Sequence, residues 1–258
     1  MQKVKKITHL KPRKRKKKKK KKVASRKGSQ SVLVPDTSLM PEPPELPEGQ
    51  GPASYWEHNA HLDTRNAPET YAGAESRSRN MVLFFDKLGI PKEASVLEIG
   101  CNVGRNLEFL RQAGFTNLHG FDVSRYAIEA ADTHFPLLST VANLRVGKAP
   151  GFLKQYSEGV DVVFTMATLL HMRPKDRHQV LKWAGENTKM FVGIEPGPGP
   201  LPRQHLAEAA VKYAKDGILF SSMDLHAELT RVGFRIVLHT VFKKLKIYCI
   251  TVGVKEDF

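Results

Sequence analysis

Two short segments of the sequence combine residue types that could hold a ligand containing a ribose. The first is the loop of residues 100–104, Gly-Cys-Asn-Val-Gly, which follows the apolar run of residues 95–99. The second is Asp122, near the end of the next apolar run. Glycines let the backbone approach a ligand closely, and a carboxylate can accept hydrogen bonds from both hydroxyls of a ribose. Together the segments predict the nucleotide-binding half of a doubly wound sheet.

A simpler explanation exists for each of these residues. Gly100 and Gly104 could serve only to make a tight turn between a strand and a helix. Asp122 could be only a charge at a helix start, because Ser124 begins the following helix and acidic side chains favour that end. The glycines and the acid occur together in the expected order, and this favours the ligand site.

The spacing argues against a dinucleotide such as NAD. Dinucleotide-binding loops have the pattern Gly-x-Gly-x-x-Gly. Its second glycine lets the backbone approach the pyrophosphate, and its third glycine lets the helix pack closely against the strand. Here those positions hold Asn102 and Arg105. A ligand without a pyrophosphate is therefore favoured.

Three segments together resemble the class I S-adenosylmethionine-dependent methyltransferases. Residues 96–106 resemble the first motif of that family, with asparagine replacing the glycine often found in its middle, and residues 120–124 (Gly-Phe-Asp-Val-Ser) resemble the second. Residues 160–172 resemble the fourth-strand motif, whose loop borders the cofactor and the transferred methyl group. The resemblance covers about residues 83–254 and implies S-adenosylmethionine as the cofactor. It assigns to the cofactor the residues Glu98, Gly100, Cys101, Asn102, Gly104, Asp122, Val123, Met166 and Ala167.

Three other positions near these motifs have open roles. His171 could be a catalytic general base that takes a proton from the acceptor, or it could merely pack at the start of a helix. Lys148 departs from the family pattern, which often has an acid there to meet the adenine amino group. Glu195 ends the fifth predicted strand, and it could contact a substrate or only support a turn.

A group of ring-containing side chains precedes the first predicted strand. They lie where the family often forms a lid over cofactor and substrate, but a hydrophobic cover for the domain explains them as well, and we favour the cover. The residues are Tyr55, Trp56, His58 and His61.

The elements that must position these residues alternate along the chain. Apolar runs predict strands, and apolar residues at helical spacing predict helices between them. Two β-rich runs near the end, residues 234–241 and 246–254, are separated by about four residues, which permits a hairpin but no crossover helix. We therefore predict an α/β fold: a doubly wound, mostly parallel seven-stranded sheet with an antiparallel last strand and helices on both faces.

The positive charge is concentrated at the N-terminus. Residues 1–35 hold 16 of the 41 Lys and Arg and no acid, which leaves 25 basic against 26 acidic residues in the rest. We predict a disordered polybasic tail (1–29), a linker rich in Pro, Glu and Ser (30–53) and a class I methyltransferase domain (54–258). The tail could be a solvated charge run, an arm for RNA, DNA or anionic surfaces, or a nuclear address.

Composition narrows the class of protein further. Two cysteines, Cys101 and Cys249, are too few for a disulfide framework, which favours an intracellular protein, cytoplasmic, or nuclear if the host is eukaryotic. No apolar run of a signal peptide or a membrane-spanning helix is present, so we expect neither. The ten histidines are scattered, so we expect no metal site.

The predicted activity is transfer of a methyl group from S-adenosylmethionine to an unidentified acceptor. We favour a small molecule, because no recognisable RNA-binding or protein-substrate domain follows the core. One alternative is an RNA or DNA methyltransferase that holds phosphates with its polybasic tail. Another is a non-catalytic scaffold that retains the fold, and the oligomeric state stays unpredicted.

Overall fold

The computed structural model describes residues 53–196, 223–241 and 248–256. All of them belong to one unit of the chain, residues 42–258. The predicted tail, almost all of the predicted linker, and the loop of residues 197–200 lie outside the described residues, as does the turn between the last two strands.

The described residues form strands and helices that alternate along most of the chain. The strands are β1 (Val96–Ile99), β2 (Leu118–Asp122), β3 (Ala142–Val146), β4 (Val160–Met166), β5 (Thr188–Pro196), β6 (Arg235–Val241) and β7 (Tyr248–Val254). The α-helices are α1 (Pro68–Gly73), α2 (Glu75–Lys87), α3 (Arg105–Gln112), α4 (Arg125–His134), α5 (Pro174–Asn187) and α7 (Leu225–Arg231). Short helical segments are η2 (Tyr55–Asn59), η3 (Ala60–Leu62), η4 (Leu138–Thr140), η5 (Gly151–Gln155) and η6 (Leu169–His171).

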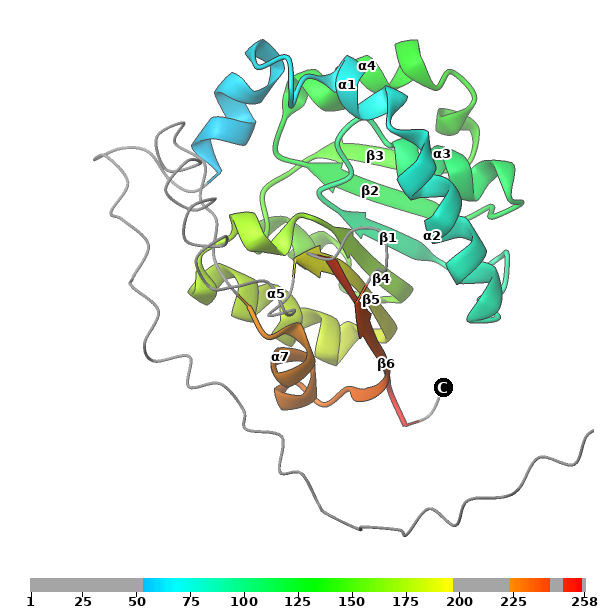
Figure 1. Cartoon of the computed structure of the whole chain (residues 1–258), viewed down its shortest axis with the longest axis vertical. Coiled ribbons are helices and arrows are strands. Elements are labelled where there is room, and N and C mark those ends of the chain that lie inside the picture. Colours follow the sequence, from blue (N-terminus) through cyan, green and yellow to red (C-terminus); the bar gives the residue numbers. More distant parts are fainter. Residues whose placement is uncertain (1–52, 197–222, 242–247, 257–258) are drawn as a thin grey trace, which may run out of the picture. The chain divides into compact units, whose positions relative to one another are not determined.

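The strands form a single seven-stranded sheet in the order β3-β2-β1-β4-β5-β7-β6 (Figure 1). Neighbours from β3 to β5 pair in parallel, whereas β7 is antiparallel to both β5 and β6. The predicted fold class is therefore confirmed. The strand order reverses between β1 and β4, where Ile99 pairs with Thr165, and ligands bind beyond the carboxyl ends of strands at such a point.

The sheet is covered on both faces by helices, which explains why most residues of its central strands are apolar. Val96 faces a core cluster that includes side chains of α2 and α3. The next residue, Leu97, faces a second cluster that includes side chains of α5 and α7. Successive side chains of a strand point to opposite faces, so a strand buried on both faces shows no polar alternation.

Local signals explain where several helices begin and end. Ser124 caps α4 as predicted, because its hydroxyl accepts the N–H of Ala127 at 3.3 Å. Helix α2 begins at Glu75, although its first turn is polar and gives no signal of apolar periodicity. Helix α7 begins at Leu225, where the carboxylate of Asp224 caps it by accepting the N–H of Ala227 at 3.0 Å.

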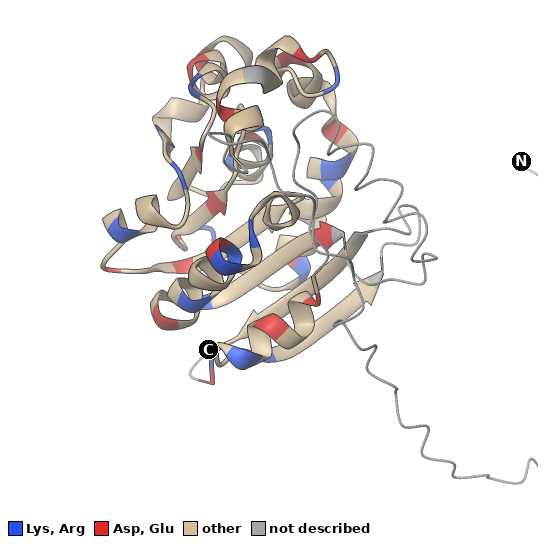
Figure 2. Ribbon diagram, turned by 90° about the vertical axis from the view of Figure 1, so that its left-hand side faces the viewer, with Lys and Arg blue, Asp and Glu red and all other residues tan. Residues whose placement is uncertain are grey.

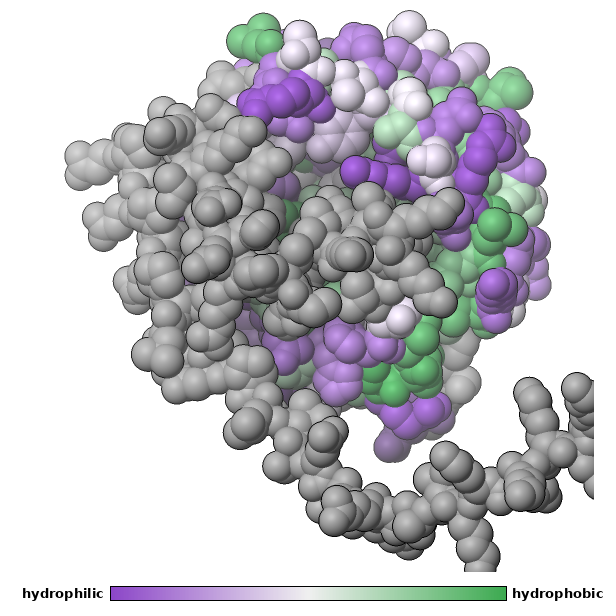
Figure 3. Space-filling model, in the orientation of Figure 1, coloured by the Kyte–Doolittle hydropathy of each residue, from purple (hydrophilic) through white to green (hydrophobic). Residues whose placement is uncertain are grey.

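Charged residues of both signs are interspersed over the described part of the chain (Figure 2), as the near balance after residue 35 leads one to expect. The face visible in Figure 3 shows hydrophilic side chains with smaller groups of apolar ones between them. Among the described helices, none is long and apolar enough to cross a membrane.

Candidate functional site

The loop after β1 has a backbone that few residue types adopt. Gly100, Asn102 and Gly104 all have positive φ values, of 75°, 49° and 77°. Asparagine is among the few residues with a side chain that tolerate this conformation, and here its Oδ1 accepts the N–H of Val103 at 2.8 Å. The asparagine that departs from the family's glycine thus suits the loop.

Asp122 joins this loop to the second strand. Its Oδ2 accepts the N–H of Asn102 at 2.8 Å, and its Oδ1 accepts the N–H of Ser124 at 2.9 Å. Burial raises the pKa of Asp122, and hydrogen bonds from backbone N–H groups oppose that rise. Each carboxylate oxygen keeps a second lone pair, so the group can still accept hydrogen bonds from a ligand.

A cavity lies against the loop, Asp122 and the segment after β4. Six of the nine residues assigned to the cofactor by resemblance line it: Gly100, Asn102, Asp122, Val123, Met166 and Ala167. The other three, Glu98, Cys101 and Gly104, are not in its lining. We call this space the cofactor cavity.

Glu98 and its neighbours form a buried polar network beneath this cavity. The Oε1 of Glu98 accepts a hydrogen bond from the side-chain amide of Asn106 at 2.6 Å. The Oδ1 of Asn106 accepts from the hydroxyl of Ser78 at 2.7 Å, and that hydroxyl accepts from Nε of Arg105 at 2.8 Å. Burial raises the pKa of Glu98 to about 8, so its carboxyl is mostly protonated at neutral pH.

We expect Glu98→Gln to make the protein's stability less dependent on pH. The folded pKa of about 8 exceeds the ordinary value of 4.5, so the folded state binds this proton more tightly. Its contribution is full below about pH 4.5 and is lost as the pH rises to about 8, at about 1.4 kcal/mol per pH unit between the two pKa values. Urea unfolding at pH 5, 7 and 9 should show a smaller decline in the free energy of unfolding for the variant. Parallel curves for both proteins would contradict a raised pKa.

The segment after β4 is held in place by a buried carboxylate. Glu195, only 1% exposed, accepts the N–H of Thr168 at 3.0 Å and the N–H of Leu169 at 3.1 Å. Burial raises its pKa to about 7. Of the two roles left open by the sequence, its contacts favour support of a backbone segment over contact with a substrate.

A second cavity of about 400 Å³ adjoins the first, and we call it the acceptor cavity. The two cavities share five lining residues: Trp56, Tyr71, Met166, Ala167 and His171. Helix α2 contributes Arg77 and helix α3 contributes Arg105. His171 therefore lies where the two spaces meet.

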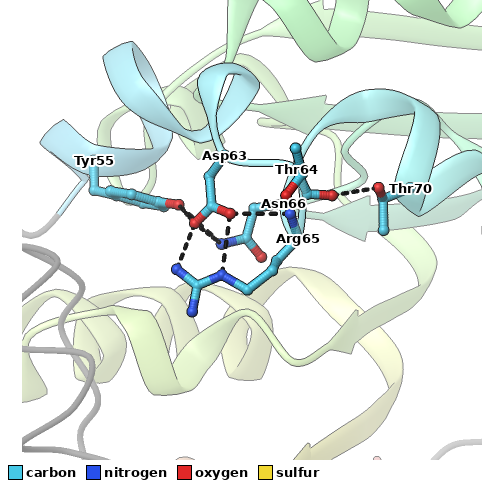
Figure 4. Close-up of polar contacts among 6 residues, drawn as sticks. All are labelled: Tyr55, Asp63, Thr64, Arg65, Asn66 and Thr70. Atoms are coloured by element: carbon cyan, nitrogen blue, oxygen red, sulfur yellow. Dashed lines mark hydrogen bonds and ion pairs between the residues drawn. The ribbon is translucent and has the colours of Figure 1, made fainter.

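Part of the N-terminal segment lines both cavities. The ring of Trp56 lies 4.8 Å from the ring of His171, measured between centroids. The preceding residue, Tyr55, is buried, and its hydroxyl donates to the carboxylate of Asp63 at 2.7 Å (Figure 4). Asp63 also accepts two hydrogen bonds from the guanidinium of Arg65, at 3.0 and 2.7 Å. This cluster fixes the segment that carries Trp56.

The other ring side chains of this segment lie differently. His58 is exposed, whereas His61 stacks on Tyr126 of α4, with ring centroids 3.7 Å apart.

Lys148, which departs from the family pattern, lines the cofactor cavity and lies 3.7 Å from the carboxylate of Glu57. The described residues contain no group of three or more His, Cys, Asp or Glu placed to hold a metal ion.

Several residues that line the acceptor cavity were not predicted from the sequence. Tyr71 and Arg77 belong to α1 and α2, which precede the motifs, and no local pattern marks them. Arg105 was noted only because it stands where a dinucleotide site needs glycine, although it begins α3 and lines the acceptor cavity. Only the tertiary packing of α1 and α2 beside α3 brings these residues together.

The sequence has recognisable relatives. Residues 97–189 match a family model described as a methyltransferase domain. The chain is 28% identical over 146 residues to the protein named EEF1A lysine methyltransferase 2 from Danio rerio, a match that covers 53% of this chain. The chain spans 61% of the length of that relative.

Solved structures share the fold with this chain at low sequence identity. Magnesium protoporphyrin IX methyltransferase from Synechocystis PCC 6803, solved with bound S-adenosylhomocysteine, superimposes with a TM-score of 0.58 and 14% identity. That superposition covers 78% of this chain and 96% of the other. An O-methyltransferase family protein from Burkholderia thailandensis gives a TM-score of 0.59 at 14% identity, covering 80% of this chain and 63% of the other.

Proposed function

We propose that this chain is a class I S-adenosylmethionine-dependent methyltransferase and that it transfers a methyl group from S-adenosylmethionine to an acceptor bound in the acceptor cavity. The observation that carries the proposal is the junction of two cavities. One is bordered by the glycine loop and Asp122, and the other opens beside it across Met166, Ala167 and His171.

The residues of the cofactor cavity fit this cofactor. Asp122 has a lone pair available on each oxygen to hold the two ribose hydroxyls. The loop of residues 100–104 leaves room for the methionine portion, because Gly100 places no side chain at the wall. Val123, Met166 and Ala167 add an apolar wall. When bound, S-adenosylmethionine supplies a methyl group activated by a positively charged sulfur.

The chain's own residues align the acceptor and exclude water. Alignment of two reactants can supply much of a rate enhancement by itself, so the reaction needs few catalytic side chains. His171 borders both cavities and is placed to take a proton from an acceptor that must lose one. Trp56 covers His171 and limits access of water to the junction.

A small molecule is the acceptor that the geometry supports best. The acceptor cavity has a volume of about 400 Å³, within the range of pockets that bind small molecules. A protein lysine is the second candidate, and the name of the relative from Danio rerio supports it.

Transfer of tritium from methyl-labelled S-adenosylmethionine tests the proposal and separates the two acceptors. The full chain is incubated with a cell extract, which is then divided into an ultrafiltrate and a protein fraction. We expect the ultrafiltrate to contain a labelled compound that chromatography separates from S-adenosylmethionine, and no such compound when Asp122→Ala replaces the wild type. Label recovered as methyl-lysine from the protein fraction would favour the second candidate. Equal label with and without the chain would contradict methyl transfer.

A further inference from the structure

Residues 55–66, which we call the strap, contribute Trp56 to the lining of both cavities. Neither of the two larger core clusters of the described chain includes a residue of the strap. Its buried apolar side chains, Tyr55 and Ala60, form a small cluster of their own, with Trp56 packed against it. So small a cluster buries little apolar area, and polar contacts must therefore supply much of what holds the strap in place.

The carboxylate of Asp63 collects polar contacts from both ends of the strap (Figure 4). It accepts the hydroxyl of Tyr55 at 2.7 Å. From Arg65 it accepts the backbone N–H at 2.9 Å and two guanidinium N–H groups at 3.0 and 2.7 Å. The side-chain amide of Asn66 in turn donates to the hydroxyl of Tyr55 at 2.9 Å. The two ends of the strap are thus joined through one carboxylate.

The contact between Tyr55 and Asp63 is the one that the strap can least lose. Hydrogen bonds from the side chain and backbone of Arg65 hold the pKa of Asp63 well below its usual range, so this carboxylate is ionised at neutral pH. The Arg65 side chain is 51% exposed, and an ion pair in water contributes little. Tyr55, however, is only 7% exposed, and a buried hydroxyl without an acceptor is costly.

Trp56 directly follows Tyr55, and its ring lies between two others. The rings of Tyr55 and Trp56 meet edge to face, with centroids 5.2 Å apart. The ring of His171 lies 4.8 Å from that of Trp56. Asp63 itself is absent from the lining of both cavities. A carboxylate outside the two cavities therefore holds the residue next to a ring that lines both of them.

Building on the proposed function, we propose that Asp63 is a positioning residue: by holding Tyr55, it keeps the ring of Trp56 against His171 as a common wall of the two cavities. Without this carboxylate the strap populates other positions. A ligand that needs the complete wall then binds only the fraction of molecules in which Trp56 is in place, and its apparent affinity falls by that fraction. The contrasting role is purely structural, in which the cluster stabilises only this end of the domain.

Calorimetric titration of S-adenosylhomocysteine into variants of the full chain tests the proposal. Asp63→Asn keeps the size of the side chain but removes its charge, and it should weaken binding by about tenfold. Tyr55→Phe removes only the hydroxyl and should weaken binding by less, so it stays informative if Asp63→Asn folds poorly. Asp86→Asn is the matched control: Asp86 forms an exposed ion pair with Lys92 and is absent from both linings, so we expect no change.

A double-mutant cycle tests whether Asp63 acts through Trp56. Trp56→Ala alone should weaken binding of S-adenosylhomocysteine, because it removes part of the wall. If Asp63 acts through this ring, Asp63→Asn in the Trp56→Ala protein should cause less than a twofold further loss. A purely structural role predicts the same loss in both backgrounds, and that result would overturn the proposal.

Fluorescence quenching follows the ring of Trp56 without any ligand. The chain has two tryptophans, so the substitution Trp183→Phe leaves Trp56 as the single emitter. In that background, acrylamide should quench Trp56 at least twofold more strongly in Asp63→Asn than in Asp86→Asn. Equal quenching would contradict a positioning role for Asp63. Failure of S-adenosylhomocysteine to bind the wild type would instead refute the proposed function, so the two failures are distinguishable.

Discussion

Replacing Asp122 with alanine should weaken binding of S-adenosylhomocysteine by about 100-fold. The substitution removes the two oxygens that accept the N–H groups of Asn102 and Ser124, and it removes the proposed acceptors for the ribose hydroxyls. Hydrogen bonds to a charged group contribute about 1.5–3 kcal/mol each, so a loss of about 3 kcal/mol corresponds to about 100-fold in affinity. Isothermal titration calorimetry measures the change directly.

Two further variants make this result interpretable. Asp122→Asn keeps the shape and one carbonyl oxygen, so its affinity should fall between those of the wild type and Asp122→Ala. Asp132→Ala removes an exposed carboxylate of α4 that is absent from the lining of both cavities, and it should bind like the wild type. A folded Asp122→Ala protein with unchanged affinity would show that this carboxylate does not hold the cofactor.

Replacing Glu195 with alanine should lower the stability of the fold by about 3 kcal/mol. The substitution leaves the N–H groups of Thr168 and Leu169 without their acceptor, and each unsatisfied buried group costs about 1–3 kcal/mol. For a domain of this size the loss corresponds to a fall of roughly 10 °C in Tm. Thermal unfolding followed by circular dichroism gives the value.

The same variant should also lose affinity for S-adenosylhomocysteine, because the segment that it releases lines the cofactor cavity. Glu195→Gln retains one acceptor oxygen and should lose about half as much stability. Glu186→Ala is the control, since Glu186 is exposed on α5 and pairs only weakly with Lys182, at 4.0 Å. A Tm for Glu195→Ala equal to that of the control would mean that the carboxylate does not support the segment.

The spacing of apolar residues along the chain was sufficient to predict the sheet. The central strands are covered on both faces, so most of their residues are apolar, and the helices between them carry one apolar face. The short gap between the last two strands was enough to predict an antiparallel pair, because no crossover fits within it. The first turn of α2 is polar, so apolar periodicity does not mark where this helix begins.

The cofactor side of the site was predictable because its chemistry is local in sequence. A tight turn needs glycine or asparagine, and a ribose needs a carboxylate at the end of the neighbouring strand; both signals can be read within about 25 residues. Gly100, Asn102 and Asp122 accordingly line one cavity. Their roles in binding the cofactor stay predictions until a ligand is titrated.

The acceptor side could not be predicted in this way. Tyr71, Arg77 and Arg105 lie on separate helices, and their convergence depends on how those helices pack. Glu195 looked equally suited to contact a substrate or to support a turn, because sequence alone does not show which N–H groups face a carboxylate. The pKa shift of Glu98 arises from burial, which also depends on the tertiary structure.

Calorimetric titration of S-adenosylmethionine and, separately, of NAD into the full chain tests the central claim most directly. We predict that S-adenosylmethionine binds at micromolar strength, about −8 kcal/mol, and that NAD does not bind. Binding of NAD alone would contradict the assignment of the glycine loop. If neither ligand binds, the fold serves a different purpose, and a non-catalytic scaffold becomes the better description of this protein.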